Sequence, residues 1–158
     1  QMCIRDSIFL YGFGSSGLAA QEFQLRLLRL GMDAEAITEL HQMVLNEARI
    51  TNACLVIGIS LSGATRELID ALDRAKARGA AVIYLTSSNA EREKRTYEEI
   101  VLAPVKKNLE YGNVISPQFP ILLILDLIYA QLLKEDRRST EAQYDTHIWE
   151  RIKDYHVG

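Results

Sequence analysis

Short apolar runs alternate with longer amphipathic segments along most of this chain of 158 residues. The clearest runs cover residues 8–11, 55–59 and 81–85, and they contain almost nothing but aliphatic and aromatic side chains. Strands that are apolar along their whole length are typical of parallel sheets, because helices cover both faces of such sheets. The alternation therefore predicts an α/β fold in which right-handed crossovers connect the strands.

Weaker patterns complete the expected order of elements. Apolar side chains three or four residues apart predict helices, and in one of these Leu68, Leu72 and Ala75 share a face. No repeat or low-complexity segment interrupts the order, so we expect one globular domain. The expected helices cover residues 18–30, 40–50, 64–78 and 121–133, with a final amphipathic helix near 144–155, and further strands are expected at 32–37 and 100–105.

Composition excludes several classes of protein. The net charge of −3 makes the chain a poor non-specific binder of nucleic acid, because phosphate neutralisation needs a basic face. The most apolar helix contains Asp126 and is shorter than the roughly 20 residues that a bilayer requires. Two cysteines are too few for a disulfide framework, and we expect Cys54 to be buried in a strand. This cysteine usage favours the reducing cytoplasm. The three histidines are scattered, so we expect no metal ion, and we expect no other cofactor.

Two segments rich in glycine and hydroxyl side chains follow two of the apolar runs, GFGSSG at 12–17 and SLSGAT at 60–65. The carboxyl ends of parallel strands share one edge of the sheet, and ligands of such sheets bind there. Backbone N–H groups at the start of a helix, together with hydroxyl groups, can surround a phosphate. We therefore predict that both segments grip the same anionic group. The residues expected at this site are Gly14, Ser15, Ser16, Ser60, Ser62, Gly63 and Thr65, with a weaker third set at Thr86, Ser87 and Ser88.

Two alternatives to an anion site stay open for these segments. Serine and threonine are common as helix caps and turn residues. The glycines at 12–17 also match the G-x-G-x-x-G pattern of a dinucleotide site, which would bind NAD and would need Glu35 or Glu39 as its acidic residue. The pattern requires an acidic residue at the end of the second strand. Glu35 falls inside the expected strand instead, and Glu39 falls later in the sequence than the pattern requires. A serine hydrolase is excluded, because Ser62 stands where G-x-S-x-G requires glycine.

The same residues resemble a known family. GFGSSGLAA followed by SLSGATRE is similar to the sugar isomerase (SIS) fold, whose domains bind phosphosugars. The segments LRLGMDAE and PILLILDLIYAQLL are most similar to the effector domain of RpiR-type transcriptional regulators, and the resemblance covers nearly the whole chain after Ser7. It implies a three-layer sandwich with a flavodoxin-like parallel sheet of about five strands. It also implies a homodimer or a higher homo-oligomer.

The resemblance assigns roles to particular residues. Ser15 and Ser16 would line one side of the phosphate or the sugar, and the segment from Ser60 to Thr65 would hold the phosphate. Ser87 falls where the family often places a further hydroxyl, and Glu110 falls near a family glutamate that contacts the sugar. The segment SPQFP at 116–120 departs from the family, which commonly has serine followed by arginine there. Its contribution to ligand or dimer contacts therefore stays open.

Residues 8–158 are expected to form a phosphosugar-sensing effector domain of an RpiR-like regulator of carbohydrate metabolism. Such regulators carry a preceding helix-turn-helix domain that this sequence lacks, so DNA would be bound only through that missing domain. Residues 1–7, QMCIRDS, look like a translated sequencing adaptor and are interpreted as a non-native leader. The alternative function is an aldose–ketose sugar-phosphate isomerase with Glu110 or His41 as its base, and we favour the sensor over the enzyme.

Overall fold

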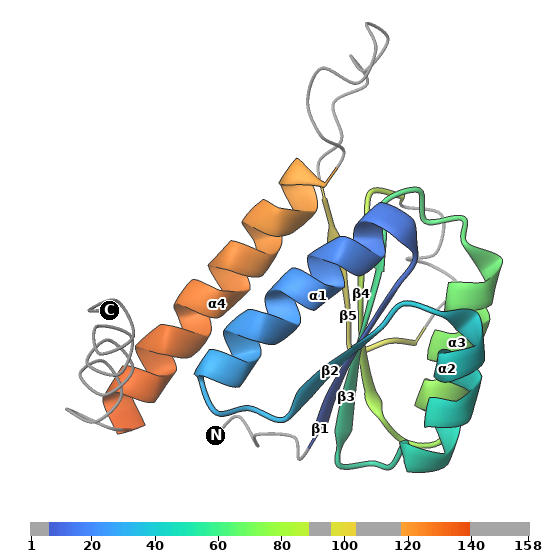
Figure 1. The fold of residues 1–158 in the computed structure, drawn as a ribbon, viewed down its shortest axis with the longest axis horizontal. Coiled ribbons are helices and arrows are strands. Elements are labelled where there is room, and N and C mark those ends of the chain that lie inside the picture. Colours follow the sequence, from blue (N-terminus) through green and yellow to red (C-terminus); the bar gives the residue numbers. More distant parts are fainter. Residues whose placement is uncertain (1–6, 89–95, 104–117, 140–158) are drawn as a thin grey trace, which may run out of the picture. The chain divides into compact units, whose positions relative to one another are not determined.

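A computed structural model of the chain describes residues 7–88, 96–103 and 118–139. Its strands form one parallel sheet of five in the order β2-β1-β3-β4-β5 (Figure 1). The predicted α/β class and five-stranded parallel sheet are confirmed, and the strand order is that of flavodoxin-like sheets. The strands are β1 (Ser7–Gly12), β2 (Ala34–Ile37), β3 (Cys54–Ser60), β4 (Ala81–Thr86) and β5 (Glu99–Leu102).

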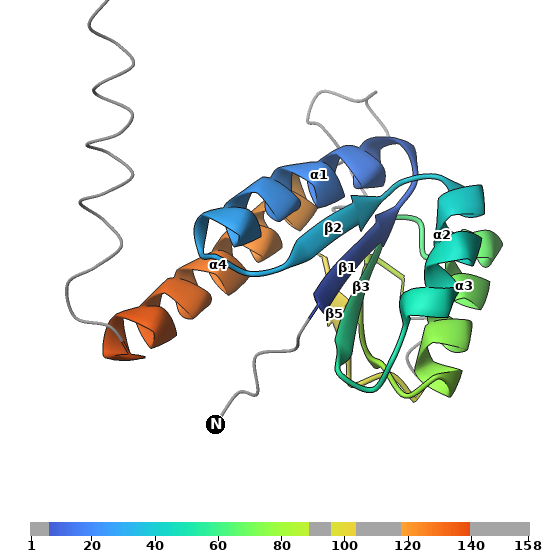
Figure 2. The same ribbon diagram turned by 60° about the horizontal axis from the view of Figure 1, so that its bottom comes forward.

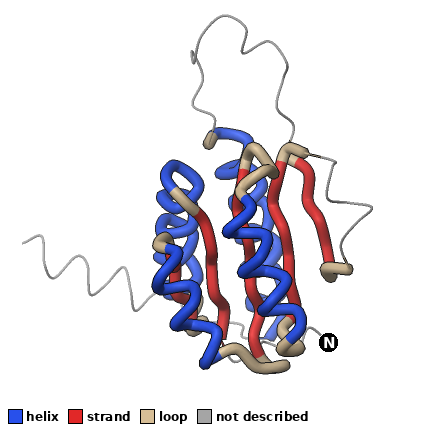
Figure 3. The backbone as a smooth tube through the Cα atoms, turned by 90° about the vertical axis from the view of Figure 1, so that its right-hand side faces the viewer, coloured by secondary structure: helices blue, strands red, loops and turns tan. Residues whose placement is uncertain are grey.

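Helices cover both faces of the sheet, as Figures 1 and 3 show. Helix α1 (Gly14–Arg29) lies on one face, whereas α2 (Leu40–Asn46) and α3 (Arg66–Ala77) lie on the other. Helix α4 (Phe119–Ser139) begins beside α1, where Arg26 forms an ion pair of 2.5 Å with Asp126. Figure 2 shows α1 and the start of α4 on the same side of the sheet. The result is the three-layer sandwich that the resemblance implied.

Burial of both sheet faces explains why the strands are apolar along their whole length. Phe9 and Tyr11 of β1 belong to one buried cluster with Leu72 of α3. Leu10, between them in sequence, is also completely buried, and alternation along a strand directs it to the opposite face. Gly58 in β3 allows α3 to come close, because a Cβ atom there would lie 2.4 Å from Cδ1 of Leu72.

Several helix boundaries differ from those predicted, most of all the end of α4 at residue 139 instead of 133. Helix α1 begins at Gly14 instead of residue 18, because the N–H groups of a first helical turn need no partner within the helix and small polar residues are tolerated there. Helix α2 ends at Asn46, and a tighter 3-10 turn, η1 (Glu47–Arg49), continues the chain. Helix α4 begins before Pro120 instead of after it, because proline is well accommodated in a first turn.

Contacts within the chain divide it into two compact units, residues 1–126 and 127–158, and the sheet belongs to the first unit. Glu110 and the final helix expected near 144–155 lie outside the described residues. Among the helices that the structure describes, none combines the length and the apolar character needed to cross a membrane. Cys54 is buried, as predicted.

Candidate functional site

The chain reverses its winding direction between β1 and β3. After β1 it passes to α1 on one face of the sheet, and after β3 it passes to α3 on the other face (Figure 1). The two strands are hydrogen-bonded neighbours, and their register places Gly12 level with Ile59. Both hydroxyl-rich segments therefore leave the same edge of the sheet from adjacent strands. This is the position at which doubly wound sheets bind their ligands.

The first segment forms the start of α1. Phe13 occupies the N-cap position and makes no side-chain capping bond, while its carbonyl oxygen accepts hydrogen bonds from the backbone N–H groups of Ser16 and Gly17. Ser15 is exposed and Ser16 is buried. Gly14 has a φ of +52°, and a Cβ atom there would meet nothing within 4 Å. The first turn of α1 is therefore open on the side of Gly14.

Close packing explains the glycine pattern at 12–17. A Cβ atom on Gly12 would lie 2.9 Å from the backbone of Ser16, and one on Gly17 would lie 2.9 Å from the carbonyl oxygen of Gly12. The glycines thus allow α1 to begin directly against the end of β1. Glu35, one acidic residue considered for a dinucleotide site, forms an ion pair of 2.5 Å with Arg49 instead. The spacing has a structural reason that does not require a dinucleotide.

The second segment gathers hydroxyl groups at the end of β3. The Oγ atom of Ser60 lies 3.1 Å from Oγ1 of Thr65 and 3.5 Å from Oγ of Ser62. Ser60 is only 4% exposed, whereas Ser62 is exposed. Thr65 occupies the N-cap position of α3 but makes no side-chain capping bond there. The hydroxyl groups of Ser60 and Thr65 therefore face each other, and within the described residues Thr65 leaves the first-turn N–H groups of α3 uncapped.

The third set of hydroxyl residues, Thr86 to Ser88 at the end of β4, holds the second segment in place by hydrogen bonds and close packing. The hydroxyl group of Ser87 donates a hydrogen bond to the carbonyl oxygen of Leu61, and the backbone N–H of Ser87 donates to the same oxygen at 3.1 Å. Gly63 has a φ of +66°, and a Cβ atom there would lie 2.4 Å from Cβ of Ser88 and 2.6 Å from Oγ1 of Thr86. Only glycine fits this contact, so the segment after β4 fixes the turn that presents Ser62.

The electrostatics of this edge come from backbone dipoles more than from side chains. Neither hydroxyl-rich segment contains a lysine. The N-termini of α1 and α3 both point their N–H groups toward this edge, which favours an anion. Arg66, the first residue of α3, is exposed and is followed by the exposed Glu67, so these two charges offset each other. An anion would be held here chiefly by hydrogen bonds.

Of the remaining residues predicted from the sequence, the structure describes some and not others. His41 is exposed on α2, and Glu110 lies outside the described residues. Within the described part of the chain, no three histidine, cysteine or acidic side chains gather as metal ligands would. Sequence reasoning missed Gln118, whose Nε2 atom donates a hydrogen bond of 2.8 Å to the carbonyl oxygen of Ser15. The only sequence signal was the departure from the family in SPQFP.

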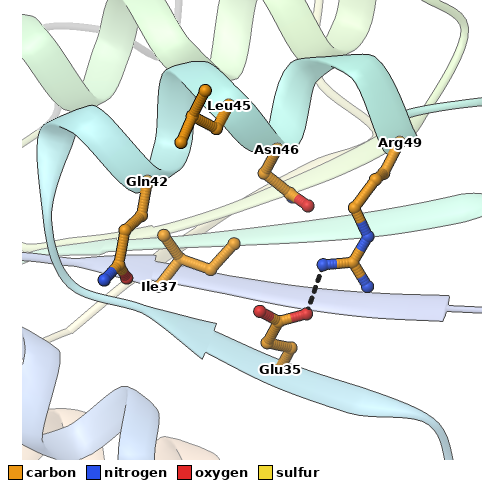
Figure 4. A pocket seen from close by; sticks show the side chains of 6 residues that line it. All are labelled: Glu35, Ile37, Gln42, Leu45, Asn46 and Arg49. Atoms are coloured by element: carbon orange, nitrogen blue, oxygen red, sulfur yellow. Dashed lines mark hydrogen bonds and ion pairs between the residues drawn. The ribbon is translucent and has the colours of Figure 1, made fainter.

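A hollow of about 210 Å³ lies between β2 and α2 (Figure 4). Nδ2 of Asn46, a residue that is 3% exposed, donates a hydrogen bond of 2.9 Å to the hydroxyl oxygen of Tyr11. Among the residues that the structure describes, its Oδ1 has no hydrogen-bond partner. Burial raises the pKa of Tyr11, and the bond from Asn46 offsets part of that rise. The hollow is lined by Glu35, Ile37, Gln42, Leu45, Asn46 and Arg49.

The model of the SIS domain family matches residues 3–123 of this sequence. The chain belongs to the SIS domain family. A curated relative, an uncharacterised HTH-type transcriptional regulator from Clostridium perfringens, is 32% identical over 130 residues. That match covers 81% of this chain but only 46% of the regulator, so this SIS domain spans less than half the length of the relative.

Solved structures share the fold of this SIS domain. The sugar isomerase domain of an RpiR transcription factor from Sphaerobacter thermophilus has a TM-score of 0.75 at 22% identity, over 87% of this chain and 75% of that one. The Vibrio vulnificus NanR protein complexed with ManNAc-6P has a TM-score of 0.78 at 23% identity, over 97% of this chain and 57% of that one. The predicted resemblance to SIS domains is thereby confirmed, and the fold is shared with the sugar isomerase domain of an RpiR transcription factor.

Proposed function

We propose that this SIS domain binds a phosphosugar at the sheet edge between β1 and β3 and senses it for a transcriptional regulator. One observation carries the proposal: the hydroxyl groups of Ser60, Ser62 and Thr65 gather beside the start of α3 without capping it. Hydroxyl groups that served only as caps would bond to the first-turn N–H groups. Here those N–H groups stay available to a phosphate.

Each segment has its own part in the proposed site. The hydroxyl groups of the second segment and the N–H groups of α3 would hold the phosphate, and Gly63 would keep that turn in place. Ser15 and Ser16 at the start of α1 would face the phosphate or the sugar from the neighbouring strand. Ser87 would act mainly by bracing the second segment through Leu61. Contact between Glu110 and the sugar rests on the family resemblance alone.

The magnitudes are sufficient for a metabolite sensor. A hydrogen bond to a charged group contributes about 1.5–3 kcal/mol. A helix N-terminus adds about 0.3–1 kcal/mol. Dissociation constants from millimolar to micromolar correspond to about 4–8 kcal/mol. Several such bonds from two segments reach this range after the cost of association. A lysine is therefore not required.

We infer that the regulator works in the cytoplasm as a homodimer or a higher homo-oligomer. Several apolar side chains are exposed on the outside of α1 and at the start of α4, which is the composition expected of a face that a second copy covers. These side chains are Leu18, Leu25, Leu28, Phe119 and Leu123. A phosphosugar that prefers one arrangement of the subunits would shift the population toward it. DNA would then be bound through a helix-turn-helix domain, as the name of the Clostridium perfringens relative suggests.

A thermal-shift panel tests the phosphosugar site. The panel contains ManNAc-6P, arabinose 5-phosphate, glucose 6-phosphate and inorganic phosphate, each phosphosugar paired with its unphosphorylated sugar. We expect at least one phosphosugar to raise the melting temperature while its unphosphorylated sugar leaves it unchanged. Equal shifts with both members of every pair would refute recognition of the phosphate.

A further inference from the structure

Gln118 joins the first hydroxyl-rich segment to the start of α4. Its side-chain amide donates a hydrogen bond of 2.8 Å to the carbonyl oxygen of Ser15, in the first turn of α1. The two residues are 103 positions apart in the sequence, so the bond is a tertiary contact. Ser15 is also one of the residues proposed to face the phosphosugar. Gln118 therefore contacts the backbone of the proposed site itself.

A second contact holds the start of α4 against α1. Arg26 forms ion pairs with Glu22 on its own helix, at 2.8 Å, and with Asp126 on α4, at 2.5 Å. Ile121 and Leu125, which lie between Gln118 and Asp126, are buried. Gln118 contacts the first turn of α1, and Asp126, further along α4, contacts Arg26, further along α1. Helix α1 and the start of α4 therefore run in the same direction (Figures 1 and 2). A change at the first turn of α1 thus has a direct route to α4.

We propose that Gln118 is a positioning residue that couples occupancy of the phosphosugar site to the first turns of α4. This inference rests on the proposed function, because it concerns the regulation of the same site. A bound phosphosugar that contacts the start of α1 favours the arrangement in which this first turn is fixed. The carbonyl oxygen of Ser15 is then held in place for the amide of Gln118, and the bond strengthens the attachment of α4.

The coupling is reciprocal and its size is limited. Whatever binding of the phosphosugar adds to the attachment of α4, the attachment adds to the affinity for the phosphosugar. One neutral hydrogen bond limits the effect on the dissociation constant to roughly two- to tenfold. The affected turns of α4 carry the exposed Phe119 and Leu123. Occupancy would therefore reach part of the face proposed for self-association.

Hydrogen exchange of the intact chain tests the coupling, with the panel phosphosugar that gives the largest thermal shift as the probe. In the wild type we expect the phosphosugar to slow exchange of the backbone amides at 119–126. In Gln118→Met, which keeps the length of the side chain but removes the donor, we expect this slowing to disappear and the affinity to fall roughly two- to tenfold. Gln118→Arg, which retains N–H donors, should restore both effects. Gln42→Met, at an exposed position of α2 on the other face of the sheet, is the control and should behave as the wild type.

Three results would overturn the coupling in distinguishable ways. Equal slowing in the wild type and in Gln118→Met would refute the role of Gln118. If Gln118→Met exchanges faster than the wild type at 119–126, and by the same factor with and without the phosphosugar, Gln118 makes a purely structural contact. This result would also refute the coupling. If no panel compound binds the wild type, the proposed function itself fails, and the coupling fails with it.

Discussion

Replacing Ser62 with alanine separates a phosphate-binding hydroxyl group from an ordinary turn residue. The side chain is exposed, and its two interactions are long: 3.3 Å from the N–H of Ala64 and 3.5 Å from Oγ of Ser60. We therefore expect the free energy of unfolding to fall by at most about 0.5 kcal/mol, which is the usual range for surface substitutions. In a domain of this size the melting temperature then falls by no more than about 1–2 °C.

The affinity for a phosphosugar should change much more than the stability. Loss of one hydrogen bond to a charged phosphate costs about 1.5–3 kcal/mol, which weakens binding by roughly 10- to 150-fold. Isothermal titration calorimetry of the wild type and of Ser62→Ala, with the best phosphosugar of the panel, measures this ratio directly.

A matched control removes a hydroxyl group at the other end of the sheet. Ser7 begins β1, and its Oγ atom donates a hydrogen bond of 2.7 Å to Asp33. Ser7→Ala therefore loses a better hydrogen bond than Ser62→Ala does, but at the amino edge of the sheet. We expect it to leave the dissociation constant unchanged. A dissociation constant of Ser62→Ala within twofold of the wild-type value would refute the assignment of Ser62 to the phosphate.

Three further predictions concern stability, pH and catalysis. Gly63→Ala should lower the melting temperature by at least about 2–4 °C, because a positive φ costs about 1–2 kcal/mol and the new Cβ atom also collides with Ser88. Gly14→Ala is the control: its φ is also positive, but its Cβ atom would enter open space, so the melting temperature should fall less. Equal falls in the two variants would contradict the collision. Burial alone would raise the pKa of Glu98, but hydrogen bonds from Lys76 and the N–H of Val82 outweigh it and hold the pKa below its ordinary value of 4.5. The ionised carboxylate thus stabilises the fold above about pH 4.5, and this stabilisation is lost as the pH falls through the folded-state pKa. The melting temperature of Glu98→Gln should therefore fall less than that of the wild type as the pH falls below about 4.5. An equal fall of the two melting temperatures would contradict this. In heavy water we expect no sustained exchange of deuterium at the sugar C2 position, and its detection by NMR would favour the isomerase over the sensor.

Much of the fold could be predicted because its signals are local. The apolar runs around Leu10, Ile57 and Leu85 form strands of a sheet that is covered on both faces, and this leaves a continuous apolar pattern in the sequence. The segments 12–17 and 60–65 could be placed at one sheet edge, because parallel strands bring their carboxyl ends together. Boundaries were less certain: serines at the start of α1 and Pro120 in the first turn of α4 both look like loop residues in a sequence.

The sequence by itself determined which chemical groups meet at the sheet edge, because residue types and strand order are enough to bring hydroxyl groups and helix starts together there. Tertiary structure alone decided what each hydroxyl group does. Thr65 turns toward Ser60 instead of capping α3, and Ser87 is engaged by Leu61. The bond from Gln118 to Ser15 could not be foreseen either, since it joins distant residues whose approach depends on how the start of α4 packs against α1. Such contacts depend on the packing of whole elements, and no local pattern in a sequence encodes that packing.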